Sequence, residues 1–176
     1  MSQGYRGIVI NSPIRDYLET SAGNWHSQRR YHYLTTGKIE EVESKLSIDF
    51  LNWEAQELLD LATNFTKDNG SNPIFLCGAI LSWDSVNAQG HNLSSGKITL
   101  GATENHLYRN QGYATQAPVK SDYTVDIHQL KMVSNYNSTV YIETIKLLSE
   151  NHRSRQTEAY KNDQLVLVGQ YLETRF

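Results

Sequence analysis

The feature that most constrains the fold is a series of short alternating segments that begins after residue 95. In each segment apolar and polar residues alternate with period two, which is typical of a half-buried strand. Turn-forming residues separate these segments, which span 96–102, 104–110, 118–126, 129–135, 139–148, 152–160 and 164–174. The connections are too short for the crossovers that parallel strands need, so the strands are expected to pair antiparallel.

Three more alternating segments precede this series, at 25–34, Val42–Phe50 and Phe75–Trp83. About ten short strands with close connections predict an all-β antiparallel barrel or sandwich. An up-and-down barrel fits this meander best, because a closed barrel leaves no unpaired sheet edge.

Two short helices are expected among the strands. The pair Ser12-Pro13 is a typical helix start, and apolar residues follow it at helical spacing until Gly23. A second helix is expected after Asn52, where apolar residues recur every three or four positions up to Phe65. The turn-forming sequence Asp68-Asn69-Gly70 predicts the end of that helix.

The length and composition fit one ordinary globular domain. The chain has 176 residues and a formal net charge of −3, and the mild acidity argues against a nucleic-acid module, which normally has a basic face. We expect a single domain over residues 12–176, preceded by a tail of residues 1–11 that shows no periodicity. No apolar run approaches the roughly 18–20 residues that span a membrane, and no signal-peptide pattern is present, so a cytoplasmic location is expected.

Cys77 is the only cysteine, which excludes an internal disulfide and a Cys₄ or Cys₂His₂ zinc site. It alternates with apolar neighbours in a strand, so a buried structural thiol is predicted. No hydrolase, kinase or metalloprotease motif occurs, and the six histidines form no close pairs. No metal site is therefore predicted.

The last three predicted strands carry charges on otherwise apolar faces. Tyr141 and Glu143 share a face of 139–148, while Arg153 and Arg155 share a face of the next strand and Glu173 belongs to the last. Two arrangements fit this pattern equally well. The charges either face the lumen of a barrel, where they pair or await a charged ligand, or form a solvent-facing ladder of weak cross-strand pairs.

Strand 25–34 carries several large polar side chains. Trp25 and Arg29 share a face with two tyrosines, while His32 lies on the other face unless a bulge intervenes. Taken alone, His32 is typical of a surface histidine and Trp25 of a core residue.

Four segments read together resemble a known family. They are Ser21-Ala22-Gly23-Asn24-Trp25-His26-Ser27-Gln28-Arg29-x-x-His32, Gly112-Tyr113-Ala114-Thr115-x-x-Pro118-Val119-x-Ser121, Glu143-x-x-x-x-x-Ser149-x-Asn151-x-Arg153-x-Arg155 and Glu173-x-Arg175. In this order and spacing, over about residues 16–176, the chain is similar to the S/U-type phycobiliprotein chromophore lyases, the CpcS, CpeS and CpcU group.

The resemblance implies a lipocalin-like or fatty-acid-binding-protein-like barrel of about ten strands with an N-terminal helix near one mouth. It also implies a lyase that binds a linear tetrapyrrole, phycocyanobilin or phycoerythrobilin, as substrate and needs no other cofactor. Such a lyase promotes attachment of the bilin to a cysteine of a phycobiliprotein subunit, where the thiol adds to the A-ring ethylidene and forms a thioether. Family members often pair, so a homodimer, or a heterodimer with an S-type subunit, is expected in a cyanobacterial cytoplasm or plastid stroma.

The resemblance also assigns catalytic roles. Glu143 matches the family's strand carboxylate, which can hold the charge of the pyrrole nitrogens and so make the conjugated system more electrophilic. Arg29 and His32 match positions near the bilin, and His32 is a candidate proton donor or acceptor near neutral pH.

Further residues are expected to bind the bilin. Arg153 and Arg155 match the family's arginine pair and suit the two propionates, because a guanidinium binds carboxylates bidentately. Trp25 and Trp83 offer flat apolar walls for a planar chromophore. Glu173 is expected to line the pocket or to form a salt bridge in the barrel. Tyr141 is predicted to contact the bilin.

The chain also departs from the family pattern. Gln89 stands where a second tryptophan is common, Lys146 replaces an aromatic residue, and the segment 156–160 is more polar than usual. These differences leave two alternatives open: a non-catalytic bilin-binding subunit of a heterodimeric lyase, or a carrier of another apolar carboxylate ligand.

Overall fold

The computed structural model describes residues 12–66 and 70–176, so the expected tail of residues 1–11 lies outside the described residues. Ten strands and two helices follow one another along the chain. The helices are α1 (Pro13–Ser21) and α2 (Gln56–Thr63). The strands are β1 (Gly23–Tyr33), β2 (Lys38–Asn52), β3 (Cys77–Asn87), β4 (Asn92–Ala102), β5 (His106–Arg109), β6 (Val119–Val125), β7 (Gln129–Tyr136), β8 (Thr139–Leu147), β9 (His152–Lys161) and β10 (Gln164–Arg175).

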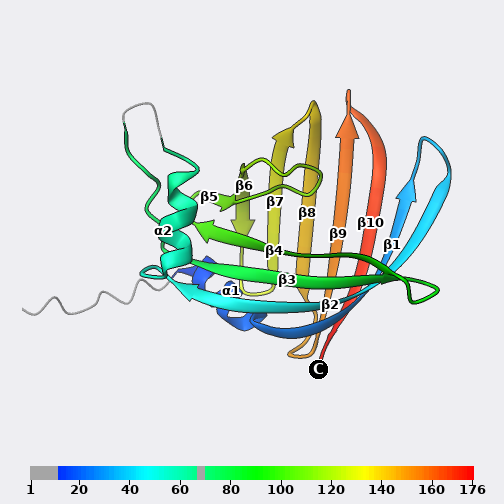
Figure 1. Cartoon of the computed structure of the whole chain (residues 1–176), viewed down its shortest axis with the longest axis horizontal. Coiled ribbons are helices and arrows are strands. Elements are labelled where there is room, and N and C mark those ends of the chain that lie inside the picture. The colour runs from blue at the N-terminus through cyan, green and yellow to red at the C-terminus, as the bar shows by residue number, and fades with distance from the viewer. Residues whose placement is uncertain (1–11, 67–69) are drawn as a thin grey trace, which may run out of the picture.

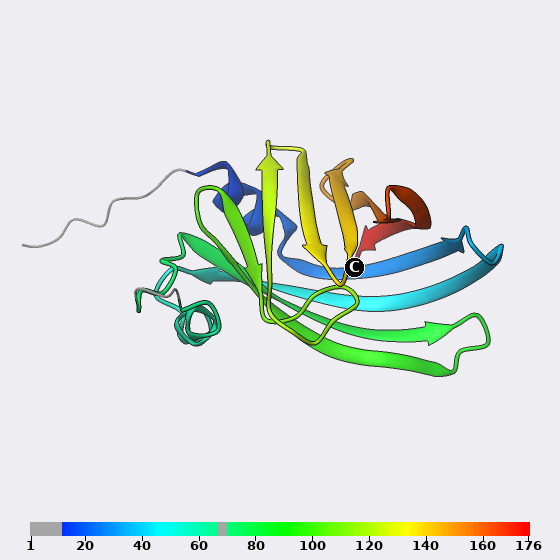
Figure 2. The ribbon, with the colours of Figure 1, turned by 90° about the horizontal axis from the view of Figure 1, so that it is seen from above.

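The strands form a closed up-and-down barrel. Each strand pairs antiparallel with its neighbour in the chain, and β1 closes the barrel against β10, from Trp25 opposite Arg175 to Tyr33 opposite Leu167. In Figure 1 the long strands β2, β3 and β4 run across the steeply inclined β7 to β10, and Figure 2 shows the interior between these two groups. The prediction of an antiparallel up-and-down barrel is confirmed, and the sandwich alternative is wrong.

Helix α1 covers one end of the barrel. It has proline in its first turn, as expected, although the hydroxyl of Ser12 makes no capping hydrogen bond. Its buried face packs against β2, β3 and β6, and the hydroxyl of Tyr17 donates to the carbonyl of Ile145 on β8 at 3.2 Å. The indole of Trp25 donates to the carbonyl of Ser21 at 3.0 Å, which fixes the exit of the helix against β1.

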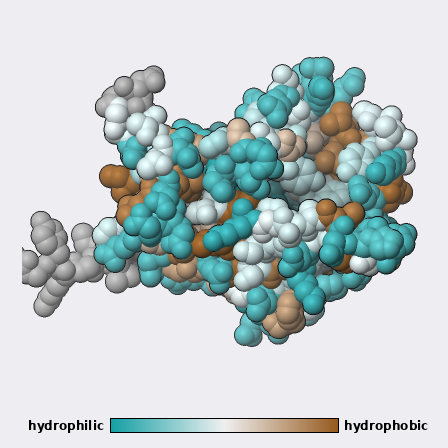
Figure 3. Space-filling model, in the orientation of Figure 1, coloured by the Kyte–Doolittle hydropathy of each residue, from teal (hydrophilic) through white to brown (hydrophobic). Residues whose placement is uncertain are grey.

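Helix α2 lies outside the barrel, against β4 (Figure 1). Leu58 and Leu61 pack in a small second core with Phe75 and Tyr108, separate from the larger core beneath α1. The helix begins at Gln56, later than the sequence predicted. Trp53, which was expected on its buried face, precedes it and is 58% exposed. Figure 3 shows apolar side chains near this helix on a mostly hydrophilic face. The helix ends at Thr63, so the stop predicted at 68–70 is wrong.

The larger core lies between α1 and the nearby strand ends and includes Cys77. This thiol has no exposed surface, and burial raises its pKa to about 11. The prediction of a buried structural thiol is confirmed. No helix among the described residues is long and apolar enough to cross a membrane.

Candidate functional site

The barrel encloses a cavity of about 480 Å³, within the range of small-molecule sites. Apolar side chains from β2, β3, β4, β7 and β8 line much of it, among them Leu46, Leu81, Leu100, Leu130 and Met132. Four arginines and Glu143 border the same space. The charged faces of the last strands therefore look into the lumen, and the alternative of a solvent-facing ladder is wrong.

Glu143 lies in the wall of this cavity without any exposed surface. Its Oε2 accepts a hydrogen bond from Nη1 of Arg109 at 2.9 Å, and its Oε1 pairs with Nη2 of Arg155. Burial opposes ionisation, but the two guanidinium groups outweigh it and lower the pKa of Glu143 to about 2. The residue is therefore a carboxylate in the ligand-free barrel.

Glu173 forms a second buried cluster. Its Oε2 pairs with Nε of Arg153 and its Oε1 accepts from the hydroxyl of Ser27 at 2.9 Å. Both partners lie directly opposite it on the neighbouring strands. Burial raises the pKa of Glu173, but Arg153 and then Arg155 reverse this, so its pKa lies below the ordinary value. Of the two expectations for Glu173, the structure favours the barrel salt bridge.

Two arginines are held more loosely and share one aromatic ring. The guanidinium of Arg155 lies 5.1 Å from the ring centroid of Tyr171, and that of Arg29 lies 5.4 Å from it. Beyond this ring, Arg29 has a hydrogen bond from its Nε to the hydroxyl of Ser27 at 3.2 Å. We call these three residues, Arg29, Tyr171 and Arg155, the arginine clamp.

The charges of the interior do not balance. Four arginines, 29, 109, 153 and 155, face two carboxylates, Glu143 and Glu173, which leaves an excess of two positive charges. Glu40 also borders the cavity, but it lies near the rim within 3.7 Å of Lys38, which compensates it. Buried cations are costly unless an anion compensates them, so the interior favours an apolar ligand with two negative charges.

A cluster of tyrosines closes part of the cavity. Tyr113, from the loop between β5 and β6, lies 5.7 Å from the ring of Tyr141, which in turn stacks on Tyr136 at 4.6 Å. The backbone N–H of Ala114 donates to the hydroxyl of Tyr136 at 3.1 Å. A Cβ on Gly112 would meet Tyr136 at 2.9 Å, so the tight loop requires glycine here. The Gly112–Thr115 element thus brings Tyr113 to the cavity wall.

The structure brings together most of the predicted site residues. Arg29, Glu143, Arg153, Arg155 and Trp83 line the cavity, and Tyr141 lies beside it in the tyrosine cluster. The ring of Trp83 packs over Gly96 on β4, where a Cβ would come within 2.4 Å of it.

Apart from Tyr141, three predicted residues do not line the cavity: Glu173, whose salt bridge in the wall is described above, His32 and Trp25. His32 lies on the outer face of β1, because the register of this strand with both neighbours runs without a bulge. Trp25 is completely buried, and the guanidinium groups of Arg153 and Arg175 lie 4.6 Å and 4.3 Å from its ring. Its position is that of a core residue, as its type alone suggested.

Arg109 is a site residue that the sequence analysis missed. It comes from the short strand β5, and its Nη2 donates to the hydroxyl of Ser134 on β7 at 3.1 Å. One signal in the sequence was that Arg109 lies two positions after Leu107 and so shares its strand face, which puts a charge on a buried face. Ser121 and Ser134 were a second signal, since small residues on inner faces leave room for a long side chain.

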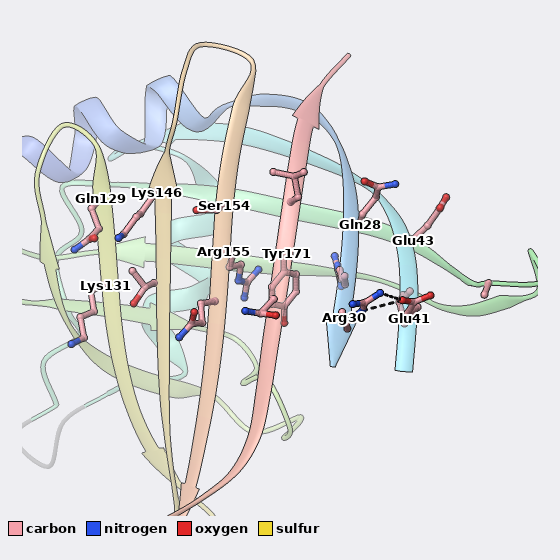
Figure 4. Close-up of a pocket in the computed structure, with 17 residues that line it drawn as sticks. Gln28, Arg30, Glu41, Glu43, Gln129, Lys131, Lys146, Ser154, Arg155 and Tyr171 are labelled. Carbon is pink, nitrogen blue, oxygen red and sulfur yellow. Dashed lines mark hydrogen bonds and ion pairs between the residues drawn. The ribbon is translucent and has the colours of Figure 1, made fainter. Parts of the chain in front are cut away.

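A larger hollow, of about 980 Å³, lies over the outer face of β7 to β10 and β1 to β2 and reaches Arg29, Arg155 and Tyr171 of the arginine clamp. Figure 4 shows Lys131 and Lys146 on one side of it and Arg30 with Glu41 on the other. Arg30 and Glu41 form an ion pair, but both are more than half exposed, so the pair contributes little to stability. The groove is open and solvated, and the enclosed cavity is the stronger candidate for a ligand site.

No group of three His, Cys, Asp or Glu side chains within 12–66 and 70–176 is placed to hold a metal ion. Glu143, a carboxylate of the cavity wall, is instead paired with Arg109 and Arg155.

Comparison with known proteins decides the family. The family model for CpeS-like proteins matches residues 13–176. The chain belongs to the CpeS-like family. CpcS 2 of Nostoc sp. is 34% identical over 95% of this chain and 93% of its own length, and CpcV of Picosynechococcus sp. is 33% identical over 96% and 85%. The chromophore lyase CpcS/CpeS of Thermosynechococcus vestitus is 29% identical over 84% of each chain.

Solved structures share the fold of this CpeS-like protein. The S-type phycobiliprotein lyase CPES from Guillardia theta matches with a TM-score of 0.71 and 19% identity over 93% of this chain and 92% of its own. Rv2717c from M. tuberculosis has a TM-score of 0.54 and 11% identity over 94% and 98%. The resemblance to S/U-type lyases and the expected lipocalin-like barrel are confirmed.

Proposed function

We propose that this CpeS-like protein is a phycobiliprotein bilin lyase. It binds a linear tetrapyrrole in the barrel cavity and promotes thioether formation between the bilin and a cysteine of a phycobiliprotein subunit. The observation that carries the proposal is the excess of two positive charges in a mostly apolar cavity inside the barrel. A bilin matches this interior, because it is a long conjugated apolar molecule with two propionates.

The arginine clamp is the part of the cavity suited to those propionates. Among the described residues, Arg29 and Arg155 each have one hydrogen-bond contact with another side chain, whereas Arg153 is paired with Glu173 and is 3% exposed. This reassigns the expected propionate pair from Arg153 and Arg155 to Arg29 and Arg155. Guanidinium groups bind carboxylates through two parallel hydrogen bonds, which also fixes the orientation of the ligand.

Glu143 supplies the electrostatic part of the reaction. A carboxylate beside the pyrrole nitrogens stabilises their protonated form, which draws electron density from the A-ring ethylidene. The thiol sulfur then forms a bond to the ethylidene carbon, the double-bond electrons move into the conjugated system, and the proton of the thiol is taken up by the tetrapyrrole. No other co-reactant is needed for this addition.

The reacting thiol belongs to the acceptor subunit and not to Cys77. A thiol must be accessible and ionised to attack, and Cys77 is fully buried with a pKa raised to about 11. We therefore expect Cys77→Ser to transfer bilin at a rate within about twofold of the wild type. Complete loss of transfer in a folded Cys77→Ser protein would show that this chain carries the bilin covalently.

A carrier of a fatty acid is the competing function. A single carboxylate would satisfy one arginine of the clamp and leave the second uncompensated, so the charge balance favours the bilin. Absorbance titration with phycocyanobilin and phycoerythrobilin, with a long-chain fatty acid as competitor, distinguishes the two. Tight fatty-acid binding together with no coloured bilin complex would refute the lyase proposal.

Transfer itself is measured with apo-phycobiliprotein subunits, with and without an S-type lyase as a second subunit. Transfer by the protein alone supports a self-sufficient lyase, and transfer only with the second subunit supports a heterodimer. Light scattering of each mixture tests the expected pairing. If the protein binds bilin but none of the mixtures shows transfer, it is a bilin carrier and the proposed lyase activity is refuted.

A further inference from the structure

Glu143 has two arginine partners that differ in how firmly they are held. Arg109 is 5% exposed and uses both terminal nitrogens, Nη1 to Glu143 at 2.9 Å and Nη2 to Ser134 at 3.1 Å. Arg155 reaches Glu143 through one terminal nitrogen, and its side chain is 17% exposed against 6% for that of Arg109. The Nε of each arginine is buried without a partner among the described residues, so the two differ in their terminal nitrogens and in exposure. Arg155 is thus the partner that can exchange.

The path of Arg109 explains why it stays in place. It starts on β5 and crosses the inner faces of β6 and β7 to reach Glu143 on β8. Ser121 and Ser134 lie opposite each other on those strands, with their hydroxyl oxygens 2.6 Å apart, and leave the space that the side chain crosses. A turn of Arg109 toward the cavity would break both of its hydrogen bonds.

A ligand carboxylate bound in the arginine clamp competes with Glu143 for the guanidinium of Arg155. The residues directly opposite Glu143 are Met132 on β7 and Thr157 on β9, and neither has a charge. Tyr171 and Glu173, on β10, act on Arg155, and Arg153 on β9 is already paired with Glu173. Without a second cation, a carboxyl group this deeply buried takes up a proton near neutral pH.

We propose that Arg109 is a positioning residue: it is the fixed counter-ion that keeps Glu143 ionised when Arg155 turns to a carboxylate of the ligand. The released Oε1 of Glu143 is then free to accept a hydrogen bond from a pyrrole N–H. The identity of the ligand rests on the proposed bilin function, but the ionisation of Glu143 does not.

The first test needs no ligand. In Arg155→Gln the mobile partner is absent, which imitates the occupied cavity. Proteins with ¹³C-labelled glutamate carboxyl groups are titrated by NMR from pH 5 to 8, and the signal missing from Arg155→Gln/Glu143→Gln identifies Glu143. We expect the Glu143 signal of Arg155→Gln to stay at its ionised position throughout. Protonation of Glu143 within this range would overturn the proposal.

The second test uses absorbance of phycocyanobilin complexes, since protonation of the chromophore shifts its absorption to the red. Wild type and Arg109→Lys should keep a red-shifted band from pH 5 to 8, and Glu143→Gln a blue-shifted one. Arg109→Gln should change from the blue-shifted form at pH 5 toward the wild-type form at pH 8. An unchanged wild-type spectrum in Arg109→Gln, or equal failure of Arg109→Lys and Arg109→Gln, would overturn the proposal.

The two tests separate this inference from the proposed function. A wild-type protein that forms no coloured complex refutes the bilin function, while the NMR titration still decides whether Arg109 keeps Glu143 ionised. If Arg109→Gln does not fold, Arg155→Gln still gives the NMR titration and Arg109→Lys still gives the absorbance spectrum.

Discussion

Glu143 and Glu173 are equally buried glutamates in one barrel, yet their surroundings differ in kind. Glu173 takes its partners from the positions directly opposite on β1 and β9, Ser27 and Arg153, and every contact is internal to the wall. Glu143 faces neutral residues on its neighbouring strands and takes its partners from further away. One of those partners, Arg155, belongs to the cavity.

The comparison teaches that burial alone does not distinguish a structural carboxylate from a functional one. What distinguishes them is whether a counter-ion can leave. Arg153 lies against the ring of Trp25 at 4.6 Å and is 3% exposed, so the Glu173 cluster is closed. Both arginines border the cavity, but the side chain of Arg155 is 17% exposed and holds Glu143 through one terminal nitrogen, so the Glu143 cluster is the more open to a ligand. The predictions below test this division, from the largest expected effect to the smallest.

The largest effect is expected from Glu173→Gln, which leaves Arg153 buried without its counter-charge. Removal of one partner of a buried pair costs about 3–5 kcal/mol in free energy of unfolding. Urea unfolding at pH 7, followed by tryptophan fluorescence, measures the loss. Glu41→Gln on the outer face is the control, and its exposed pair with Arg30 should change stability by less than about 1 kcal/mol. A loss in Glu173→Gln as small as in the control would contradict a structural role.

A second prediction concerns acid. The folded pKa of Glu143, about 2, lies below the value of about 4.3 for an unfolded glutamate. The unfolded chain therefore binds protons first as pH falls, so the stability contributed by Glu143 is present above about pH 5 and is lost toward pH 2. The loss amounts to about 3 kcal/mol. The pKa of Glu173 is also lowered and adds a loss of the same sign.

Urea unfolding of wild type and Glu143→Gln between pH 2 and 6 measures this acid dependence. The two stability curves should converge as pH falls, because only the wild type loses the contribution of Glu143. Parallel curves would mean that Glu143 is already neutral in the folded protein, which would contradict an ionised Glu143 between Arg109 and Arg155.

The arginine clamp gives a third prediction, which concerns binding. Arg155→Gln removes a charge-assisted contact with a ligand carboxylate, worth about 1.5–3 kcal/mol, so bilin affinity should fall about ten- to hundredfold. Arg30→Gln, on the outer groove, is the matched control and should bind as the wild type does. Absorbance titration measures both. Equal affinities in the two variants would place the bilin outside the arginine clamp.

The fold could be predicted from the sequence because an up-and-down barrel repeats one local rule. Period-two alternation located every strand, and neighbouring strands in the chain are neighbours in the sheet. The same rule puts Glu173 and Arg153 on inner faces of adjacent strands, where they lie directly opposite each other. It also put His32 on the face of β1 opposite to Trp25 and Arg29, and the structure shows that this face is the outer one.

The Glu143 cluster was beyond that rule. Arg109 reaches Glu143 across two intervening strands, and alternation says nothing about a contact between β5 and β8. The position of Trp25 beneath α1 depends on how the helix packs, which the strand pattern does not contain. The family resemblance supplied Glu143 and the arginines of β9, but not the distinction between a fixed and a mobile counter-ion.

The smallest effect is expected at Tyr171, where the two clusters meet. Its ring lies about equally far from Arg29 and Arg155, at 5.4 Å and 5.1 Å, and holds both guanidinium groups in place before a ligand arrives. A cation–π contact is worth about 0.5–1 kcal/mol, so Tyr171→Leu should weaken bilin binding about two- to fivefold. Tyr171→Phe keeps the ring and loses the contacts of the hydroxyl, a long one to Thr157 at 3.3 Å and those with Tyr31 and Tyr113, so it should bind within about twofold of wild type. If the phenylalanine variant loses as much affinity as the leucine variant, the hydroxyl and not the ring holds the arginine clamp, and the closed and open clusters are linked through Thr157.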